Sequence, residues 1–331
     1  MRHLLSIDDL DRDDIELICD RARSFAEVGR RDIKKVPTLR GRTIISLFYE
    51  SSTRTSSSFE LAAKRLSADV VSVKSAGSSV DKGESLKDTV ATFTAYSPEA
   101  IVIRHPHAGA AQLITEWTSA AVVNAGDGKH EHPSQALLDT YTLLERLADH
   151  DGRPRGDLAG KRIWIVGDVL HSRVARSCAL CFRAMGAEVT VCGPPTLLPR
   201  GMAEEFGCAV THDLDGLAEA DVVYALRMQH ERMHDSFVPS LREYAARYQI
   251  DSRRLGSRQL LMHPGPVNRG VELSPEVIDG PASLITAQVE SGLVVRMAIL
   301  YELLAGGDPR ASGDRSAEAE LPAPTPIGEP A

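Results

Sequence analysis

The chain has 331 residues, of which 46 are Asp or Glu and 38 are Lys or Arg, so its formal net charge is −8. Charges of both signs are interspersed, which argues against binding to nucleic acid or to an anionic membrane, because those partners require a basic stripe. No apolar segment approaches the roughly 20 residues that span a membrane. The N-terminal segment MRHLLSIDDLDRDD turns acidic instead of continuing as a signal peptide. We therefore expect a cytoplasmic protein of about two domains with a cleft between them.

The first half of the chain alternates between strand and helix patterns. An amphipathic helix is expected over residues 13–28. Strand patterns follow at residues 43–49, 69–73, 100–104 and 121–125, and helical patterns alternate with them at residues 53–66, 85–96, 109–118 and 133–147. This alternation predicts one α/β domain with a mostly parallel sheet.

A polar segment rich in Gly and Pro, residues 149–160, marks a boundary, and a second α/β series follows it. Its strands are expected at residues 162–166, 188–192, 221–226 and 259–262, with helices between them. A last helix, residues 289–304, is expected to pack back on the first domain. We therefore predict two doubly wound domains with mostly parallel sheets, linked by crossing helices: residues 1–148 with 289–305, and residues 149–288. Residues 306–331 have little to bury and should be disordered.

The segment FYESSTRT, residues 48–55, indicates an anion site. A buried strand ends here and a helix begins, so the hydroxyls of Ser52, Thr53 and Thr55 lie where unpaired backbone N–H groups and the positive end of the helix dipole favour an anion. Arg54 adds a planar guanidinium that matches phosphate oxygens. An ordinary Ser/Thr helix cap is the alternative interpretation.

The ends of the other first-domain strands carry similar chemistry. In open parallel sheets ligands bind beyond the carboxyl ends of the strands, so Arg104, His132 and Gln135 should converge with the anion site. Together these groups suit a small molecule that bears a phosphate and a carbonyl. A surface position for Arg104 and a helix-capping role for His132 remain alternatives.

Cations also follow the strands of the second domain. Arg173 and Arg227 suit a second substrate that carries carboxylates, although an ion pair with Glu50 is the alternative for these arginines. The polar loop at residues 75–84 presents Lys82, with a solvated surface loop as its alternative. The rigid turn at residues 263–266 offers backbone carbonyls to a small amide.

Metal and thiol chemistry are not expected. The five cysteines are an odd number among apolar neighbours, and Cys178 and Cys181 lie inside a helical pattern without a second pair, which favours reduced, buried thiols. His130 and His132 are joined by no Cys or carboxylate cluster at ligand spacing. We expect no metal and no cofactor.

Taken together, these segments resemble the aspartate/ornithine carbamoyltransferase family, and most closely its aspartate branch. The resemblance covers about residues 1–305. It rests on seven motifs in the family's order: FYESSTRTSSSFE, SVDKGES, VIRHP, NAGDGKHEHPSQALLD, HSRVARS, LRMQHER and MHPGPVNRG. It implies transfer of the carbamoyl group of carbamoyl phosphate to the amine of L-aspartate, a step of de novo pyrimidine biosynthesis.

The resemblance also implies roles for individual residues. The carbamoyl phosphate site would comprise Ser52, Thr53, Arg54, Thr55 and Arg104 at the phosphate, Thr55, Arg104 and His132 at the carbonyl oxygen, and Gln135 with the backbone around Gly265 and Pro266 at the amide. The L-aspartate site would comprise Arg173, Arg227, Lys82 and Gln229. Of these, Arg54, Thr55, Arg104 and His132 would be catalytic, and Glu50 would couple closure of the two domains.

In this family a loop of a neighbouring subunit in a homotrimer completes each active site, which here would bring in Lys82 and either Ser78 or Ser79. Regulatory chains or dihydroorotase are further partners that the family allows. Three other functions compete with this one. An ornithine carbamoyltransferase is disfavoured because Arg227 and Lys82 would repel the ammonium group of ornithine. A noncatalytic scaffold is disfavoured because it would not need every polar group that the chemistry requires. A nucleotide-binding module is disfavoured because no G-x-G-x-x-G motif follows a strand.

Overall fold

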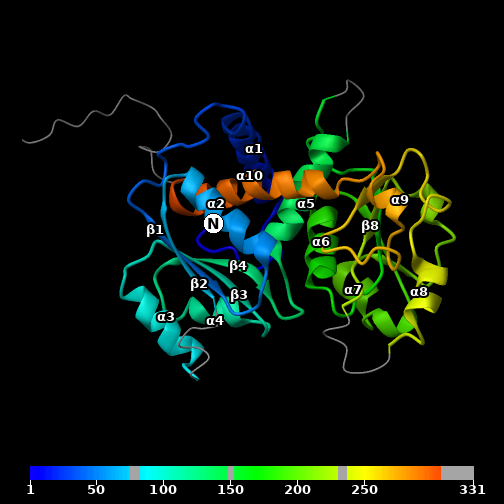
Figure 1. The fold of residues 1–331 in the computed structure, drawn as a ribbon, viewed down its shortest axis with the longest axis horizontal. Helices are drawn as coiled ribbons and strands as arrows, with labels where there is room; N and C mark the ends of the chain where they lie inside the picture. The colour runs from blue at the N-terminus through cyan, green and yellow to red at the C-terminus, as the bar shows by residue number, and fades with distance from the viewer. Residues whose placement is uncertain (75–82, 148–152, 230–236, 307–331) are drawn as a thin grey trace, which may run out of the picture.

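The computed structural model describes residues 1–74, 83–147, 153–229 and 237–306. The first half of the chain forms a parallel sheet in the order β2-β1-β3-β4. Its strands are β1 (Thr43–Phe48), β2 (Asp69–Lys74), β3 (Ala100–His105) and β4 (Ala121–Asp127). The accompanying helices are α1 (Arg12–Gly29), α2 (Thr53–Arg65), α3 (Leu86–Thr94), α4 (Ala110–Ile114) and α5 (Pro133–Arg146). Figure 1 shows this sheet with α3 and α4 on one side and α1, α2 and α5 on the other.

The second half forms a separate parallel sheet in the order β7-β6-β5-β8-β9. Its strands are β5 (Arg162–Val166), β6 (Glu188–Cys192), β7 (Ala209–Thr211), β8 (Val222–Ala225) and β9 (Leu260–Met262). The helices are α6 (Arg173–Ala184), α7 (Met202–Phe206), α8 (Leu241–Tyr248), α9 (Pro275–Ile278) and α10 (Ile285–Leu304), with short 3₁₀ turns at η2 (Pro195–Leu197) and η3 (Leu217–Glu219). The predicted α/β class with parallel sheets is confirmed.

Three elements differ most from the sequence-based expectation. Strand β7 was not predicted, because it has only three residues and they are exposed or half-exposed at the sheet edge. Helix α4 ends at Ile114 instead of near residue 118, and the Thr115 hydroxyl donates to the Gln112 carbonyl at 2.7 Å, a local bond that competes with helix continuation. Helix α10 begins four residues earlier than expected, at Ile285.

Helix α10 joins the two halves. It is apolar on nearly all sides, which is typical of a buried helix, and it packs against α1, α2 and α5 while also contacting β9. Helices α5 and α6 pack against each other between the two sheets, and Figure 1 shows α10 running across both halves. One apolar core therefore continues from the helices of the first sheet into the second. No helix in the described part of the chain is long and apolar enough to cross a membrane.

Each of the two sheets has one topological switch point, where the strand order reverses direction. From β1 the chain moves to β2 on one side and then to β3 on the other, so the segments that follow β1 and β3 diverge and leave a crevice. In the second sheet the same reversal occurs between β5 and β8. The segments after β1, β5 and β8 carry Arg54, Arg173 and Arg227, and Arg104 lies at the end of β3.

Candidate active site

A cavity of about 820 Å³ lies between the two halves of the molecule. It is lined by every predicted site residue that the structure describes: Glu50, Ser52, Thr53, Arg54, Thr55, Arg104, His132, Gln135, Arg173, Arg227, Gln229, Gly265 and Pro266. Lys82, Ser78 and Ser79 lie outside the described residues. The residues predicted from the sequence therefore come from both halves of the chain and lie together around one cavity.

The first turn of α2 forms one wall of the cavity. Ser52 is the N-cap residue, yet its side chain makes no capping hydrogen bond, so its hydroxyl is not committed to the helix. Burial, and then the positive charge of Arg227, lowers the pKa of Arg54 from its ordinary value, which still leaves a guanidinium that is charged at neutral pH. The uncommitted Ser52 hydroxyl at a helix N-terminus, beside the guanidinium groups of Arg54 and Arg227, forms a site for a phosphate-sized anion.

Glu50 occupies the centre of this positive region. Arg173, buried in the first turn of α6, donates from Nη2 to both carboxylate oxygens of Glu50 at 2.5 and 2.6 Å. Arg104 donates from Nη2 to Glu50 Oε1 at 3.2 Å. The ion pair that the sequence left as an alternative for Arg173 is therefore present. Among the described residues that line the cavity, Glu50 is the only acid, and it holds arginines from both halves of the chain.

His132 is held in place by its backbone. It precedes Pro133, the first residue of α5, and its N–H donates to Ser177 Oγ of α6 at 2.9 Å. Its side chain makes no capping bond to α5. Burial, followed by the charges of Arg104, Arg296 and Arg173, lowers the pKa of His132 well below its usual value. A neutral imidazole in the cavity can donate one hydrogen bond without carrying a charge.

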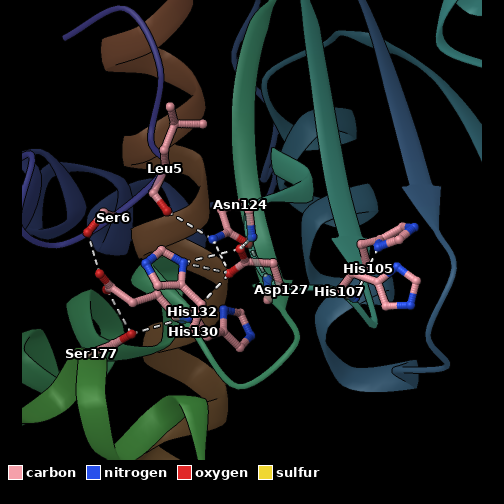
Figure 2. A network of polar contacts seen from close by, with 12 residues as sticks. Leu5, Ser6, His105, His107, Asn124, Asp127, His130, His132 and Ser177 are labelled. Atoms are coloured by element: carbon pink, nitrogen blue, oxygen red, sulfur yellow. Dashed lines mark hydrogen bonds and ion pairs between the residues drawn. The ribbon is translucent and has the colours of Figure 1, made fainter. Parts of the chain in front are cut away.

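The loop before His132 is fixed by a polar network, which Figure 2 shows. Asn124 donates from Nδ2 to the Leu5 carbonyl at 2.9 Å and to Asp127 Oδ1 at 2.8 Å. Buried Glu131 accepts hydrogen bonds from Ser6 and, at 2.9 Å, from Ser177. The N-terminal segment, the loop and α6 are thereby linked, so the position of His132 depends on contacts outside the cavity.

The far end of the cavity contains groups that the sequence did not single out. Arg296 of α10 is 5% exposed, its guanidinium lies 5.1 Å from the centroid of the Phe59 ring, and burial lowers its pKa to about 10. Gln288 of the same helix also lines the cavity, and its Nε2 donates to Asp139 Oδ1 of α5 at 2.7 Å. The available sequence signal was a single Arg, Arg296, within the apolar run of residues 292–301.

Two backbone segments of the second half complete the lining. The Gln229 N–H donates to buried Asp168 Oδ2 at 3.2 Å, which fixes the start of the segment after β8. In the turn after β9, the Gly265 N–H donates to His263 Nδ1 at 2.8 Å, and the Gly265–Pro266 peptide is cis. Burial lowers the pKa of His263 despite its contact with Glu272.

The cysteines are free and buried, in agreement with the sequence-based expectation. Burial raises the pKa of Cys181 and Cys192 to about 12, so these thiols are not poised to act as nucleophiles. Within the described ranges, no group of three or more His, Cys, Asp or Glu side chains is arranged to hold a metal ion.

Comparison with family models assigns both halves of the chain to one group of transferases. Residues 2–145 match the carbamoyl-P binding domain of aspartate/ornithine carbamoyltransferase, and residues 159–303 match the Asp/Orn binding domain. The chain therefore belongs to the aspartate/ornithine carbamoyltransferase family.

Individual relatives are similar over almost the whole chain. The aspartate carbamoyltransferase catalytic subunit of Acidothermus cellulolyticus is 54% identical, with 99% of each sequence covered. The catalytic subunit of M. jannaschii aspartate transcarbamoylase superposes with a TM-score of 0.80 at 34% identity and covers 93% of this chain and 100% of its own. Trypanosoma cruzi aspartate transcarbamoylase in complex with carbamoyl phosphate and aspartate gives a TM-score of 0.80 at 31% identity, covering 92% and 97%.

Proposed function

We propose that this chain transfers the carbamoyl group of carbamoyl phosphate to the amine of L-aspartate, giving N-carbamoyl-L-aspartate and phosphate. The observation that carries the proposal is the cavity itself, where a Ser/Thr-rich helix N-terminus meets arginines from both sheets. Relatives named aspartate carbamoyltransferase catalytic subunit, at 54% identity, support the same activity.

The carbamoyl phosphate would lie against the start of α2. Ser52, Thr53, Arg54, Thr55 and Arg104 would bind the phosphate, because these groups line the same cavity. Thr55, Arg104 and His132 would hold the carbonyl oxygen, and Gln135 with the backbone at Gly265 and Pro266 would hold the amide. We keep residues 1–148 with 289–305 as the carbamoyl phosphate-binding domain.

The reaction would follow from these positions. The neutral amine of aspartate attacks the carbamoyl carbon, and negative charge develops on the carbonyl oxygen near Thr55, Arg104 and neutral His132. Donors already fixed toward that oxygen stabilise the charge without reorganising. The carbon–oxygen bond to phosphate then breaks, and the departing phosphate accepts the proton lost by the amine.

Residues 149–288 would form the L-aspartate-binding domain. Arg173 and Arg227 would bind the two carboxylates, with Gln229 and Lys82 assisting. Since Arg173 is paired with Glu50 in this structure, a substrate carboxylate would compete with Glu50 for it. We propose that this exchange couples aspartate binding to closure of the two halves.

We also propose that the chain works as a cytoplasmic homotrimer in which the Lys82 loop of one subunit completes the site of the next. Association with regulatory chains or with dihydroorotase would add control, but it would not alter the site.

The test is phosphate release from carbamoyl phosphate with L-aspartate or L-ornithine as acceptor, with the product identified by mass. Carbamoyl-aspartate formed from aspartate alone is expected. Turnover with ornithine would contradict the assignment of Arg173 and Arg227 to substrate carboxylates. Binding of carbamoyl phosphate without turnover of either acceptor would point to another acceptor or to a scaffold role.

A further inference from the structure

The orientation of the Gln135 amide is set by Asp139, one helical turn further along α5. Gln135 Nε2 donates to both carboxylate oxygens of Asp139, each at 3.1 Å. An amide nitrogen can only donate, so the carboxylate commits Nε2 and leaves the carbonyl oxygen Oε1 of Gln135 as the group available to the cavity. Gln135 therefore presents an acceptor to a bound molecule.

Asp139 is surrounded by donors from four elements. It is fully buried, and it accepts hydrogen bonds from Gln135 of α5, Gln288 Nε2 of α10 at 2.7 Å, the Tyr224 hydroxyl of β8 at 2.6 Å and Cys178 Sγ of α6 at 3.5 Å. A carboxylate that collects only donors acts as a fixed acceptor. Buried polar networks of this kind hold their members in one arrangement when every group is satisfied.

The Asp139 carboxylate also positions the backbone turn at residues 263–266, and it does so through Gln288. Because Gln288 donates to Asp139, its carbonyl oxygen Oε1 faces the other way, where it accepts from the His263 N–H at 3.0 Å. His263 in turn accepts from the Gly265 N–H at 2.8 Å. The backbone turn at residues 263–266 is thereby tied to Asp139, like the Gln135 side chain.

Both groups that our proposed function places at the substrate amide thus depend on one residue outside the cavity. We propose that Asp139 is a positioning residue that makes this end of the site an acceptor of hydrogen bonds, and so selects acyl phosphates whose acyl group carries N–H. This inference rests on the proposed function and refines its donor specificity. Acetyl phosphate, which has a methyl group where carbamoyl phosphate has an amide, would leave the Gln135 carbonyl without a partner.

The experiment compares carbamoyl phosphate with acetyl phosphate as donors to L-aspartate in the full-length protein. The products are N-carbamoylaspartate and N-acetylaspartate, quantified by mass, and the readout is the ratio of the two kcat/KM values. If acetyl phosphate is not turned over, its inhibition constant against carbamoyl phosphate supplies the comparison. The variants are Asp139→Ala and Asp139→Asn, with Thr140→Val as the matched control, because Thr140 is the adjacent fully buried residue and bonds to Cys181.

We expect Asp139→Ala to lower kcat/KM for carbamoyl phosphate by about tenfold or more while changing the value for acetyl phosphate by about twofold at most. Asp139→Asn keeps one acceptor oxygen and should give a ratio between wild type and Asp139→Ala. Thr140→Val should leave the ratio unchanged. A ratio that stays constant in Asp139→Asn, or falls equally in Thr140→Val, overturns the proposal.

If Asp139 had a purely structural role, its replacement would lower kcat/KM for both donors by the same factor. An equal loss for the two donors in Asp139→Ala therefore also contradicts the inference. If Asp139→Ala fails to fold, the ratio in Asp139→Asn decides by itself. Wild-type turnover of carbamoyl phosphate with aspartate tests the proposed function independently. Absence of wild-type turnover would contradict the proposed function. Normal wild-type turnover with an unchanged ratio of kcat/KM values in the Asp139 variants would contradict only the proposed role of Asp139.

Discussion

A Cβ atom added at Gly265 would lie 2.7 Å from the guanidinium carbon and both terminal nitrogens of Arg54. Arg54 follows the first strand of one sheet, and Gly265 follows the last strand of the other. The backbone of the second half therefore packs directly on the guanidinium that we assign to the phosphate. Only glycine combines this close approach with the positive φ of 65° found at this residue.

We therefore expect Gly265→Ala to raise the KM for carbamoyl phosphate by about tenfold, because the methyl group displaces Arg54 and the backbone is strained by about 1 kcal/mol. Gly270→Ala is the matched control: Gly270 has a φ of 85°, but nothing lies within 4 Å of an added Cβ. Steady-state kinetics and thermal unfolding of both variants separate the two effects. An equal rise in KM for both would mean that backbone strain alone is responsible.

Arg54→Ala should remove turnover while leaving the fold intact. The Arg54 side chain lines the cavity and is exposed, so its loss leaves no packed core open. Loss of one fixed donor to the reacting phosphate should lower kcat by about 10²-fold or more. Thermal unfolding and kcat are measured beside Arg40→Ala, an exposed arginine outside the cavity. An Arg54→Ala variant that retains most of its kcat would refute the assigned role.

The fold was predictable where local pattern and burial agree. Strands β5 (Arg162–Val166) and β6 (Glu188–Cys192) have the expected bounds, because each is an apolar run that starts at a charged residue. The start of α10 was misplaced, since a helix that is apolar on nearly all sides shows little periodicity at its ends. The edge strand β7 is too short to give a two-residue alternation.

The candidate site was predictable for residues that lie at a strand end or in the helix turn that follows it, such as Arg104 and Thr55, since the carboxyl edge of a parallel sheet has a recognisable position in the sequence. Asp139 was not predictable in the same way. It lies within a helix, and two of its partners, Tyr224 and Gln288, are 85 and 149 residues away along the chain. Such a network forms only when the two halves pack together.

Glu50→Gln should destabilise the unliganded protein and increase its response to phosphate. Glu50 neutralises Arg104 and Arg173, so the neutral amide leaves two neighbouring guanidinium groups less well compensated, at a cost of about 1–3 kcal/mol. An added anion restores the missing charge. Thermal unfolding with and without inorganic phosphate should show a lower Tm and a larger phosphate-induced rise than in wild type.

The control for this prediction is Glu60→Gln, which removes a carboxylate from the Lys64 pair on the surface of α2. Exposed pairs of this kind contribute little to stability, so Tm and the phosphate response should both stay close to wild type. A phosphate response that is equal in all three proteins would show that Glu50 does not compete with anions.

Asp139→Asn should change the pH dependence of stability. Burial raises the pKa of Asp139 to about 6, although Tyr224, Gln288, Gln135 and Cys178 donate to it and oppose that rise. Since the ordinary value is 3.8, the folded state binds the proton more tightly than the unfolded state. The stability that this protonation contributes is therefore present below pH 3.8 and is lost as the pH rises through about 6.

An asparagine at this position has no such titration, so the variant should gain stability relative to wild type as the pH rises. The difference should grow by on the order of 2 kcal/mol between about pH 4.5 and about pH 7, and should stay constant above that. Unfolding is measured by denaturant at matched protein concentration for both proteins. A difference that is flat across this range would show that Asp139 is charged throughout it.

The proposed sharing of sites predicts that two inactive variants restore each other. The body of the site is the set of cavity residues that one subunit supplies, including Arg54 and His132. In Arg54→Ala this body is defective but the Lys82 loop is intact, and in Lys82→Ala the loop is defective but the body is intact. If a site combines the body of one subunit with the loop of the next, every mixed trimer contains one site in which both parts are wild type. Random mixing at equal amounts should then recover about a quarter of wild-type activity, since about three-quarters of trimers are mixed and each has one working site in three.

The variants are unfolded together, refolded and assayed for carbamoyl-aspartate, with each variant refolded alone as the control. Mixing Arg54→Ala with His132→Ala provides the matched comparison, because both defects lie in the same body of the site and no arrangement of subunits separates them. Recovery in the first mixture alone would require Lys82 to act across a subunit boundary. Absence of recovery in both would mean that each chain builds its own site, and that the Lys82 loop folds onto the cavity of its own subunit.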